Sequence, residues 1–247
     1  MPDDFDLRLR NAKLAALAEF AAGAGHEINN PVATILGRAQ LLLQSEADPA
    51  KRRSLATIAS QALRIRDMIG DLMLFAHPPT PEPVPTDLAS VAVEVCDPLA
   101  ERATEAGATL EIRADGPLAA VVDPLQLAVA LSAVVENGLN AAGRGGRVTV
   151  SAQKRDGVPI LTVADDGPGF TDADREHAFD PFYSGRQAGR GLGFGLPKAW
   201  RIVNLAGGTI EITSRPGDTL VTIALPRPEA REDEAPAEPH GPDGRSW

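Results

Sequence analysis

Near its start the chain reads Gly25-His26-Glu27-Ile28-Asn29-Asn30-Pro31, inside a stretch from about residue 6 to residue 46 that alanine and leucine dominate. Apolar or small residues alternate three and four positions apart through this stretch: Leu14, Ala18, Ala21, Gly25, Ile28, Val32, Ile35, Ala39 and Leu42. A repeat of about 3.5 residues is typical of a helix that packs along one seam. The stretch is therefore predicted to form one long helix, with Pro31 inside it.

A second stretch, from about residue 50 to residue 76, repeats the pattern after the turn that Asp48-Pro49 indicates. Its seam consists of Leu55, Ile58, Ala62, Ile65, Ile69, Leu72 and Phe75. Each helix has one apolar stripe, so the hairpin of residues 1–76 cannot enclose a core alone. Two copies would form a four-helix bundle, and the pattern therefore predicts a homodimer.

The domain boundary is predicted at residues 77–85, where five prolines indicate a semi-rigid linker. Residues 86–227 mix helical and strand patterns: helices at about 88–106, 123–142 and 192–206, and strands at 109–113, 147–153, 158–164, 209–213 and 219–225. This mixture predicts an α+β two-layer sandwich with helices on one face of a mixed sheet. The tail at 228–247 is rich in proline and acidic residues, and it is predicted to be disordered.

Composition excludes several classes of protein. The formal net charge of -10 over 247 residues argues against nucleic acid or an anionic membrane as a partner. The lone cysteine, Cys96, cannot form an intramolecular disulfide, which favours a reducing compartment. We find no uninterrupted apolar run of about 18 residues, so we expect a cytoplasmic chain without membrane insertion.

His26 is the first residue that could carry chemistry. One residue is about 100° of rotation on a helix, so His26, next to seam residue Gly25, is expected to face water. Asn30 lies one turn on, on the same face, and Glu27 flanks the ring. An exposed imidazole can act as a nucleophile when an acceptor such as Glu27 orients its other nitrogen. A solvated histidine on a polar helix face is the simpler explanation, and the residues alone leave both open.

Four later segments could build a nucleotide site, although each also has a simpler explanation. Asn137 could offer an amide oxygen to Mg²⁺, or it could be the polar edge of a core helix. The turn Asp165-Asp166-Gly167-Pro168-Gly169 follows a strand, and it could be only a tight turn. The aromatic segment 178–186 could be a packed cluster. The glycine-rich segment 189–195 opens a helix, where amides and the helix dipole favour phosphate, or it could be a flexible loop.

The order of these segments over residues 20–217 resembles that of the sensor histidine kinases of two-component systems. The resemblance implies an ATP-binding domain with the Bergerat fold, shared with gyrase, Hsp90 and mismatch-repair ATPases. It implies that His26 accepts the γ-phosphoryl group of ATP, with Glu27 as the orienting base, and that Asn30 assists transfer. Flexing of the linker is expected to bring ATP to His26. The partner implied is the receiver domain of a response regulator, which takes the phosphoryl group on an aspartate and is dephosphorylated in some systems.

The same resemblance assigns the residues of the nucleotide site. Asp165 would bind the adenine amino group, Gly167 and Gly169 would let the backbone approach the base, and Asn137 would bind Mg²⁺. Glu136 or Asn140 could help Asn137. The other residues expected to contact ATP are Arg186, Gly189, Arg190, Gly191, Leu192 and Gly193.

Three positions depart from the family pattern. Ala133 stands where an asparagine is usual, four residues before Asn137, so ATP hydrolysis is expected to be slow. Arg190 stands where threonine is usual and could contact phosphate directly, and Phe194 stands where leucine is usual. Ala133 supports an alternative function, a dimeric nucleotide-binding scaffold or a regulator dominated by phosphatase activity. The intact acceptor motif favours an active kinase.

Overall fold

The computed structural model describes residues 4–114, 116–183 and 193–227. Its N-terminal part is a hairpin of two long helices, α1 (Asp4–Ser45) and α2 (Pro49–Ala76), which confirms the two helices predicted from the heptads. Asp48 caps α2 by accepting a hydrogen bond from the Ala50 amide at 2.7 Å. Arg52 closes the turn by donating to the carbonyl oxygens of Leu43 and Glu46.

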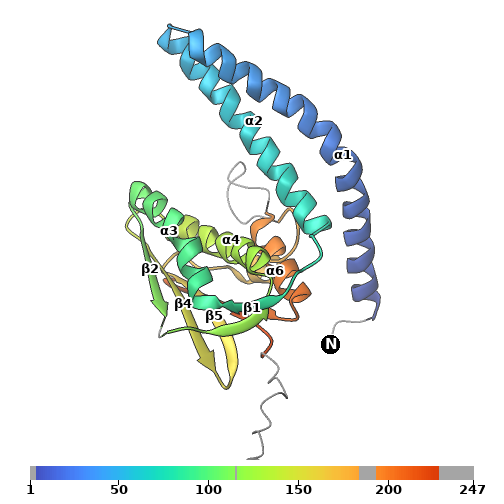
Figure 1. The fold of residues 1–247 in the computed structure, drawn as a ribbon, viewed down its shortest axis with the longest axis vertical. Helices are drawn as coiled ribbons and strands as arrows, with labels where there is room; N and C mark the ends of the chain where they lie inside the picture. Colours follow the sequence, from blue (N-terminus) through green and yellow to red (C-terminus); the bar gives the residue numbers. More distant parts are fainter. Residues whose placement is uncertain (1–3, 115, 184–192, 228–247) are drawn as a thin grey trace, which may run out of the picture.

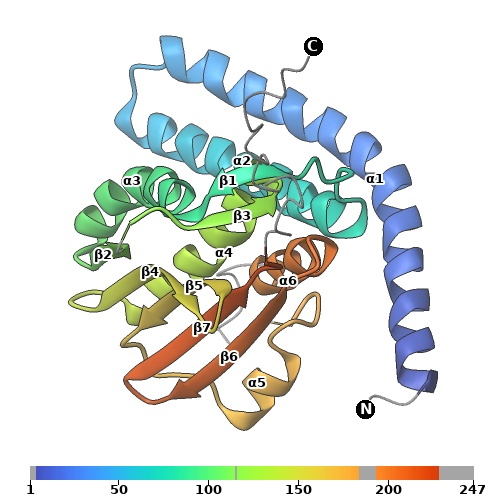
Figure 2. The same cartoon turned by 60° about the horizontal axis from the view of Figure 1, so that its bottom comes forward.

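The apolar seam of the hairpin is only partly covered. Val32, Ala39, Ala59 and Ala62 are buried between the helices, whereas four large seam residues are between 42% and 53% exposed: Ile35, Leu42, Ile58 and Ile65. Figure 2 shows that α1 bends between its two halves, and the helix contains Pro31, a residue that removes one helical hydrogen bond. One hairpin therefore leaves part of its apolar surface open to solvent.

The C-terminal domain follows from residue 84. Its elements are β1 (Val84–Asp87), α3 (Leu88–Ala106), β2 (Thr109–Ala114), β3 (Ala119–Val122), α4 (Pro124–Ala142), β4 (Arg147–Arg155), β5 (Val158–Asp165), α5 (Asp172–His177), α6 (Gly195–Leu205), β6 (Thr209–Arg215) and β7 (Asp218–Ala224).

Five strands form the main sheet, in the order β2-β4-β5-β7-β6. The β2–β4 pair is parallel and the other pairs are antiparallel. Strands β1 and β3 form a separate antiparallel pair. Helices α3, α4 and α6 lie on one face of the main sheet (Figures 1 and 2), which confirms the predicted two-layer α+β sandwich.

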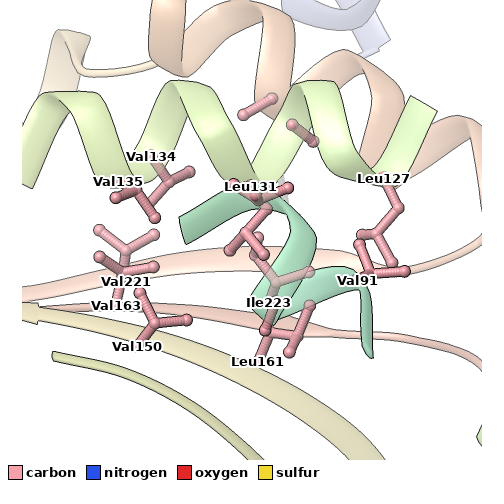
Figure 3. Packing of buried hydrophobic residues seen from close by; sticks show 14 of the residues in the cluster. Val91, Leu127, Leu131, Val134, Val135, Val150, Leu161, Val163, Val221 and Ile223 are labelled. Atoms are coloured by element: carbon pink, nitrogen blue, oxygen red, sulfur yellow. The ribbon is translucent and has the colours of Figure 1, made fainter. Parts of the chain in front are cut away.

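Helix α4 is the centre of the core. Figure 3 shows Leu127, Leu131, Val134 and Val135 of this helix facing side chains of the sheet, among them Val150, Leu161, Val163, Val221 and Ile223. Burying each of these side chains fully contributes about 1.5–3 kcal/mol. Of the helices in the described ranges, α4 is the one long and apolar enough to cross a membrane, and its packing in the core gives an alternative reason for that composition.

Three elements were missed by the sequence pattern, namely β1, β3 and α5. Strand β1 begins at Val84, inside the predicted linker, and pairs with β3 through Val84 and Val122. Pro85 is tolerated there because a two-stranded pair has open edges. Helix α5 is one short helix with a capping box between Thr171 and Asp174, too short to show a helical period.

Candidate active site

His26 lies on an exposed face of α1, about halfway along the helix. The preceding residue, Gly25, is buried, and a Cβ atom placed on it would lie only 2.6 Å from Sδ of Met73 on α2. This close packing turns His26 and Glu27 outward, and both are exposed. The imidazole of His26 and the carboxylate of Glu27, which are neighbours in the chain, are therefore both accessible to a reactant.

The turn after His26 contains the polar residues that the sequence analysis singled out. Asn30 is exposed, and its carbonyl oxygen accepts a hydrogen bond from the Thr34 hydroxyl at 3.1 Å. Pro31 has no amide hydrogen, so it cannot donate the helical bond to the carbonyl of Glu27. Asn29 is half-buried, so Asn30 is the more accessible of the two amides.

Asn137 and Asn140 lie in the C-terminal half of α4, where Asn137 is half-buried and Asn140 is exposed. The Asn140 amide donates to the carbonyl oxygen of Glu136 at 2.6 Å, and the Glu136 carboxylate pairs with Arg102 of α3 at 3.0 Å. Ala133, the position that departs from the family pattern, is 7% exposed and packs in the core. Its methyl group carries no polar atom toward the site.

Asp165 ends β5 and is 6% exposed. One of its carboxylate oxygens accepts a hydrogen bond from the Gly167 amide at 3.0 Å. Helix α4 comes close at this point, since a Cβ atom on Gly138 would lie 3.6 Å from the Cβ of Asp165. The helix that carries Asn137 and the strand that carries Asp165 therefore meet at one place.

Both glycines of the turn after β5 are required by packing. A Cβ atom on Gly167 would lie 2.8 Å from the carbonyl carbon of Ala141, at the end of α4. Gly169 has a φ of 82°, and a Cβ atom there would lie 2.9 Å from the carbonyl oxygen of Arg215. The family resemblance implies that these glycines let the backbone approach a base, which stays a prediction. The structure adds that the turn is wedged between α4 and the β6–β7 turn.

The aromatic segment before the glycine-rich loop forms a small polar network. Asp174 accepts hydrogen bonds from the hydroxyl groups of Thr171 and Tyr183, which lower its pKa. The same bond to Asp174 raises the pKa of Tyr183. The rings of His177 and Tyr183 pack in a tilted arrangement with their centroids 5.2 Å apart. The hydrogen bond between His177 and Asp180 at 2.8 Å raises the pKa of the imidazole. No role was predicted for His177, and its place here is one of packing and local charge.

The second glycine-rich segment is only partly within the described residues. Gly193 has a φ of 72°, and a Cβ atom there would overlap the carbonyl oxygen of Tyr183, so only glycine fits. Helix α6 begins at Gly195, and its N-cap residue, Phe194, offers no side-chain acceptor to the first amides. Five predicted nucleotide contacts lie outside the described residues: Arg186, Gly189, Arg190, Gly191 and Leu192.

Phe194 joins the two domains. Its ring is 2% exposed and packs with Leu72, Phe75 and Ala76 of α2, with the ring centroids of Phe75 and Phe194 5.8 Å apart. The ring of Phe182 also packs edge-to-face with that of Phe194, and the two ring centroids are 4.8 Å apart. The prediction that Leu72 and Phe75 belong to the seam between the helices is therefore incomplete, because both bury against the C-terminal domain.

An ion pair and a methionine complete this junction. Lys198 of α6 donates to Asp71 of α2 at 2.5 Å, and the lysine side chain is only 14% exposed. Met73, which packs on Gly25 beside His26, also packs against the cluster that contains Phe194. The candidate acceptor and the start of α6 are thus connected through one side chain of α2.

Comparison with protein-family models gives two matches. Residues 16–80 match the His Kinase A (phospho-acceptor) domain, and residues 122–229 match the histidine kinase-, DNA gyrase B-, and HSP90-like ATPase.

Curated relatives match over nearly the whole chain. The sensor histidine kinase ZraS of Klebsiella oxytoca is 31% identical over 91% of this chain and 49% of its own length. The C4-dicarboxylate transport sensor protein DctB of Rhizobium meliloti is 34% identical, over 86% of this chain and 35% of its own. The sensory histidine kinase/phosphatase NtrB of Klebsiella oxytoca is 30% identical, over 89% and 65%. The chain spans about half the length of these relatives, from 35% to 65%.

Solved structures share the fold. Full-length ShkA in complex with AMPPNP superimposes with a TM-score of 0.73 at 23% identity, covering 84% of this chain and 45% of that one. The histidine kinase ThkA in complex with the response regulator protein TrrA gives a TM-score of 0.65 at 21% identity, covering 90% and 65%.

Proposed function

Because this chain belongs to the sensor histidine kinase family, with a phospho-acceptor hairpin followed by a histidine kinase-type ATPase domain, we propose that it uses ATP to phosphorylate His26. The observation that carries the proposal is the exposure of His26 on α1, while its neighbour Gly25 packs on Met73, which borders the Phe194 cluster at the start of α6. The acceptor and the nucleotide-binding segments are therefore held in one structural unit.

The chemistry at His26 follows from its neighbours. One imidazole nitrogen attacks the γ-phosphorus of ATP, the bond from that phosphorus to the β–γ bridging oxygen breaks, and ADP leaves. Glu27 takes the proton from the other imidazole nitrogen as the new N–P bond forms. The exposed Glu27 carboxylate lies next to His26 in the chain and supports this role. Phosphoryl transfer depends mainly on positioning and on neutralising charge.

For ATP itself, we assign the adenine to Asp165 and the phosphates to the start of α6. Asp165 is nearly buried and already accepts one amide, so its carboxylate is fixed in place for a donor such as an adenine amino group. Phe194 gives helix α6 no side-chain cap, and the amides of Gly195 and Leu196 in its first turn could bind an anion, whereas Pro197 has no amide hydrogen. The residues between Arg186 and Gly193 that the sequence predicts to contact ATP directly precede this helix, and we assign them to the phosphates as well.

Mg²⁺ is the metal that we propose at α4, bound by Asn137 with help from Asn140. Within residues 4–114, 116–183 and 193–227, no group of three histidine, cysteine or carboxylate side chains forms a metal site. The oxygen ligands would then be amide and phosphate oxygens, which suit a hard cation. When bound, Mg²⁺ would neutralise charge on the phosphates.

We propose a response-regulator receiver domain as the partner that takes the phosphoryl group from His26 on an aspartate. The superposition with ThkA, which was solved in complex with a response regulator, supports this partner. We also propose a homodimer, since Ile35, Leu42, Ile58 and Ile65 leave an exposed apolar stripe on the hairpin. Our proposed location is the cytoplasm, without membrane insertion by this chain. The exposed amide of Asn30 beside His26 favours a second activity, dephosphorylation of the same partner.

Phosphorylation with γ-labelled ATP tests the proposal. We expect label on the wild-type chain that is lost in acid and kept in alkali, and no label on His26→Gln. His177→Gln is the matched control, because this histidine is half exposed but lies on α5, and it should keep the label. Label that survives in His26→Gln, or the absence of label on a chain that binds ATP, would refute the autokinase function and favour the scaffold alternative.

A further inference from the structure

The proline-rich segment between the two domains runs along the start of α4. Strand β1 pairs with β3 through Val84 and Val122, and β3 leads directly into the N-cap residue of α4, Asp123. The chain before β1 therefore passes the first turn of α4, where two polar side chains meet it.

Two hydrogen bonds fasten this segment. The side-chain amide of Gln126 donates to the carbonyl oxygen of Pro79 at 2.9 Å, and the amide of Glu82 donates to Oδ2 of Asp123 at 3.0 Å. Gln126 is only 8% exposed, which is unusual for a glutamine and requires a partner. The other oxygen of Asp123 accepts the amides of Leu125 and Gln126, so one carboxylate caps α4 and holds the linker.

The groups on α4 match what a proline-rich chain can offer. Proline has no amide hydrogen, so between Pro78 and Pro83 only Thr80 and Glu82 can donate from the backbone. Such a segment is held best by a donor to a carbonyl and by contact with its rings. Gln126 supplies the donor, and Pro81 lines a small hollow with Leu127 and Ile202. The Glu82 amide is also the main cause that lowers the pKa of Asp123, which keeps this acceptor charged.

The consequence is a very short hinge. Helix α2 ends at Ala76 and the first fastened residue is Pro79, so only His77 and Pro78 lie between them. Two such residues span about 7 Å, whereas nine free residues at 77–85 would span about 30 Å. The sequence predicted a semi-rigid linker that flexes somewhere within residues 77–85, and these bonds leave His77 and Pro78 as the residues between α2 and the fastened segment.

We propose that Asp123 and Gln126 form a linker clasp, a pair of positioning residues that makes α2 and α4 move together. Helix α4 carries Asn137, so a shift of α2 would reach the nucleotide site directly instead of being absorbed by the linker. The clasp would also hold ATP at high effective concentration around His26. This consequence rests on the proposed kinase function, whereas the clasp itself does not.

The variants Asp123→Asn and Gln126→Met, singly and together in the full chain, break the clasp with little change of shape. Asparagine keeps an oxygen for capping α4 but cannot accept from Glu82 at the second position. Methionine keeps the length of glutamine without the donor. Leu125→Ala is the matched control, because this side chain is 78% exposed on the same turn of α4.

Two readouts test the clasp without activity. The Glu82 amide should exchange with solvent at least about tenfold faster in the double variant, because its acceptor is gone. Spin labels at Ser60→Cys and Lys154→Cys, in chains diluted into unlabelled ones, should give a broader distance distribution than in wild type. Cys96 is fully buried and its pKa is raised to about 11, so it should not take a label. Unchanged exchange together with an unchanged distribution would overturn the clasp.

The third readout tests the functional consequence. We expect the autophosphorylation rate at saturating ATP to fall by about 3- to 10-fold in the double variant, with the KM for ATP within about twofold of wild type. Transfer from phosphorylated His26 to a receiver domain should be unchanged, and Leu125→Ala should match wild type throughout. A rate equal to wild type despite a broadened distance distribution would overturn the positioning role. A wild-type chain that takes no phosphoryl group from ATP would instead refute the kinase function. Amide exchange and the spin-label distances would still decide whether the clasp exists.

Discussion

At the scale of single residues, Asp165 and Asp166 show how adjacent carboxylates have different tasks. Asp165 is nearly buried at the end of β5 and faces the meeting point with α4, while Asp166 is exposed and accepts the amide of Arg147 at 2.8 Å. The buried residue is the one that the family pattern assigns to adenine. Burial fixes its direction, and a fixed carboxylate can select one donor.

Asp165→Asn should weaken ATP binding about 10- to 100-fold, because a hydrogen bond to a charged group contributes about 1.5–3 kcal/mol. An asparagine oxygen can still accept from the Gly167 amide, so the thermal stability should stay close to wild type. Calorimetric titration with ATP measures the effect. Asp166→Asn is the control and should bind ATP as wild type does; equal binding by both variants would contradict the assignment.

Three aspartates at helix N-termini, Asp87, Asp123 and Asp174, have lowered pKa values and give a pH dependence at the same scale. The pKa of Asp87 lies below its ordinary value because the Ser90 hydroxyl and the Leu118 amide donate to the carboxylate. The pKa values of Asp123 and Asp174 also lie below the ordinary value of an aspartate. A carboxyl whose folded pKa is lowered stabilises the fold above its unfolded pKa, and this stabilisation is lost as the pH falls through the folded pKa.

The free energy of unfolding should therefore fall as the pH drops below about 4. Urea unfolding of wild type and Asp87→Asn at several pH values measures this. Asparagine keeps the cap and does not titrate, so the variant should lose less stability than wild type between neutral and acid pH. Parallel curves for the two proteins would show that Asp87 does not contribute.

At the scale of elements, the contact between α2 and α6 depends on aromatic burial more than on charge. Phe194 and Phe75 are each 2% exposed, whereas Asp71 of the ion pair is 40% exposed. The Lys198 side chain is 14% exposed, but solvent reaches the pair through Asp71, and pairs that solvent screens contribute at most about 1 kcal/mol. Removing the ring should therefore loosen the junction more than removing the charge.

Hydrogen exchange at the end of α2, residues 70–77, can compare the two contributions. Phe194→Ala should accelerate exchange there strongly, whereas Lys198→Met should have a small effect, and Phe194→Leu should lie between them. The hydrophobic core of the C-terminal domain does not include Phe194, so its unfolding temperature should change little. A larger effect of Lys198→Met than of Phe194→Ala would show that charge dominates the junction.

At the scale of the whole molecule, the sequence predicted the architecture better than the contacts between its parts. Heptad spacing located both hairpin helices, and alternation located the five strands of the main sheet, because both signals follow from one buried face. The same spacing could not show whether Phe75 packs on α1 or on Phe194, since each is an apolar partner. It also could not show that Gln126 faces Pro79, 47 residues earlier in the chain.

For the candidate site too, some features could be predicted from the sequence and others could not. The motifs predict His26, Asn137 and Asp165 as site residues, since residue type and order are visible in a sequence. The need for glycine at Gly167 arises from Ala141 across the fold, and no local pattern reveals such a distance. Strands β1 and β3 were missed because four residues are too few for a period of two to stand out.

The proposed dimer should be sensitive to one charge placed in the exposed hairpin stripe. Ile58→Lys should shift the chain toward a monomer in sedimentation velocity, because a lysine in the centre of a four-helix bundle loses hydration without a partner. Leu125→Lys is the control, as it removes a more exposed apolar side chain on the C-terminal domain and should leave the mass unchanged. A dimer that survives Ile58→Lys would place the interface elsewhere.

The position of β7 in the sheet also affects how the protein is made. Strand β5 pairs with β4, which precedes it, and with β7, whose last residue is Ala224. During synthesis on the ribosome the helical hairpin of α1 and α2 can form early. The edge of β5 that pairs with β7 stays open until about 60 further residues, to the end of β7, have emerged. An open apolar strand can pair with another nascent chain. A ribosome that stalls before Asp218 would therefore carry a chain prone to aggregation, with the acceptor helix already folded.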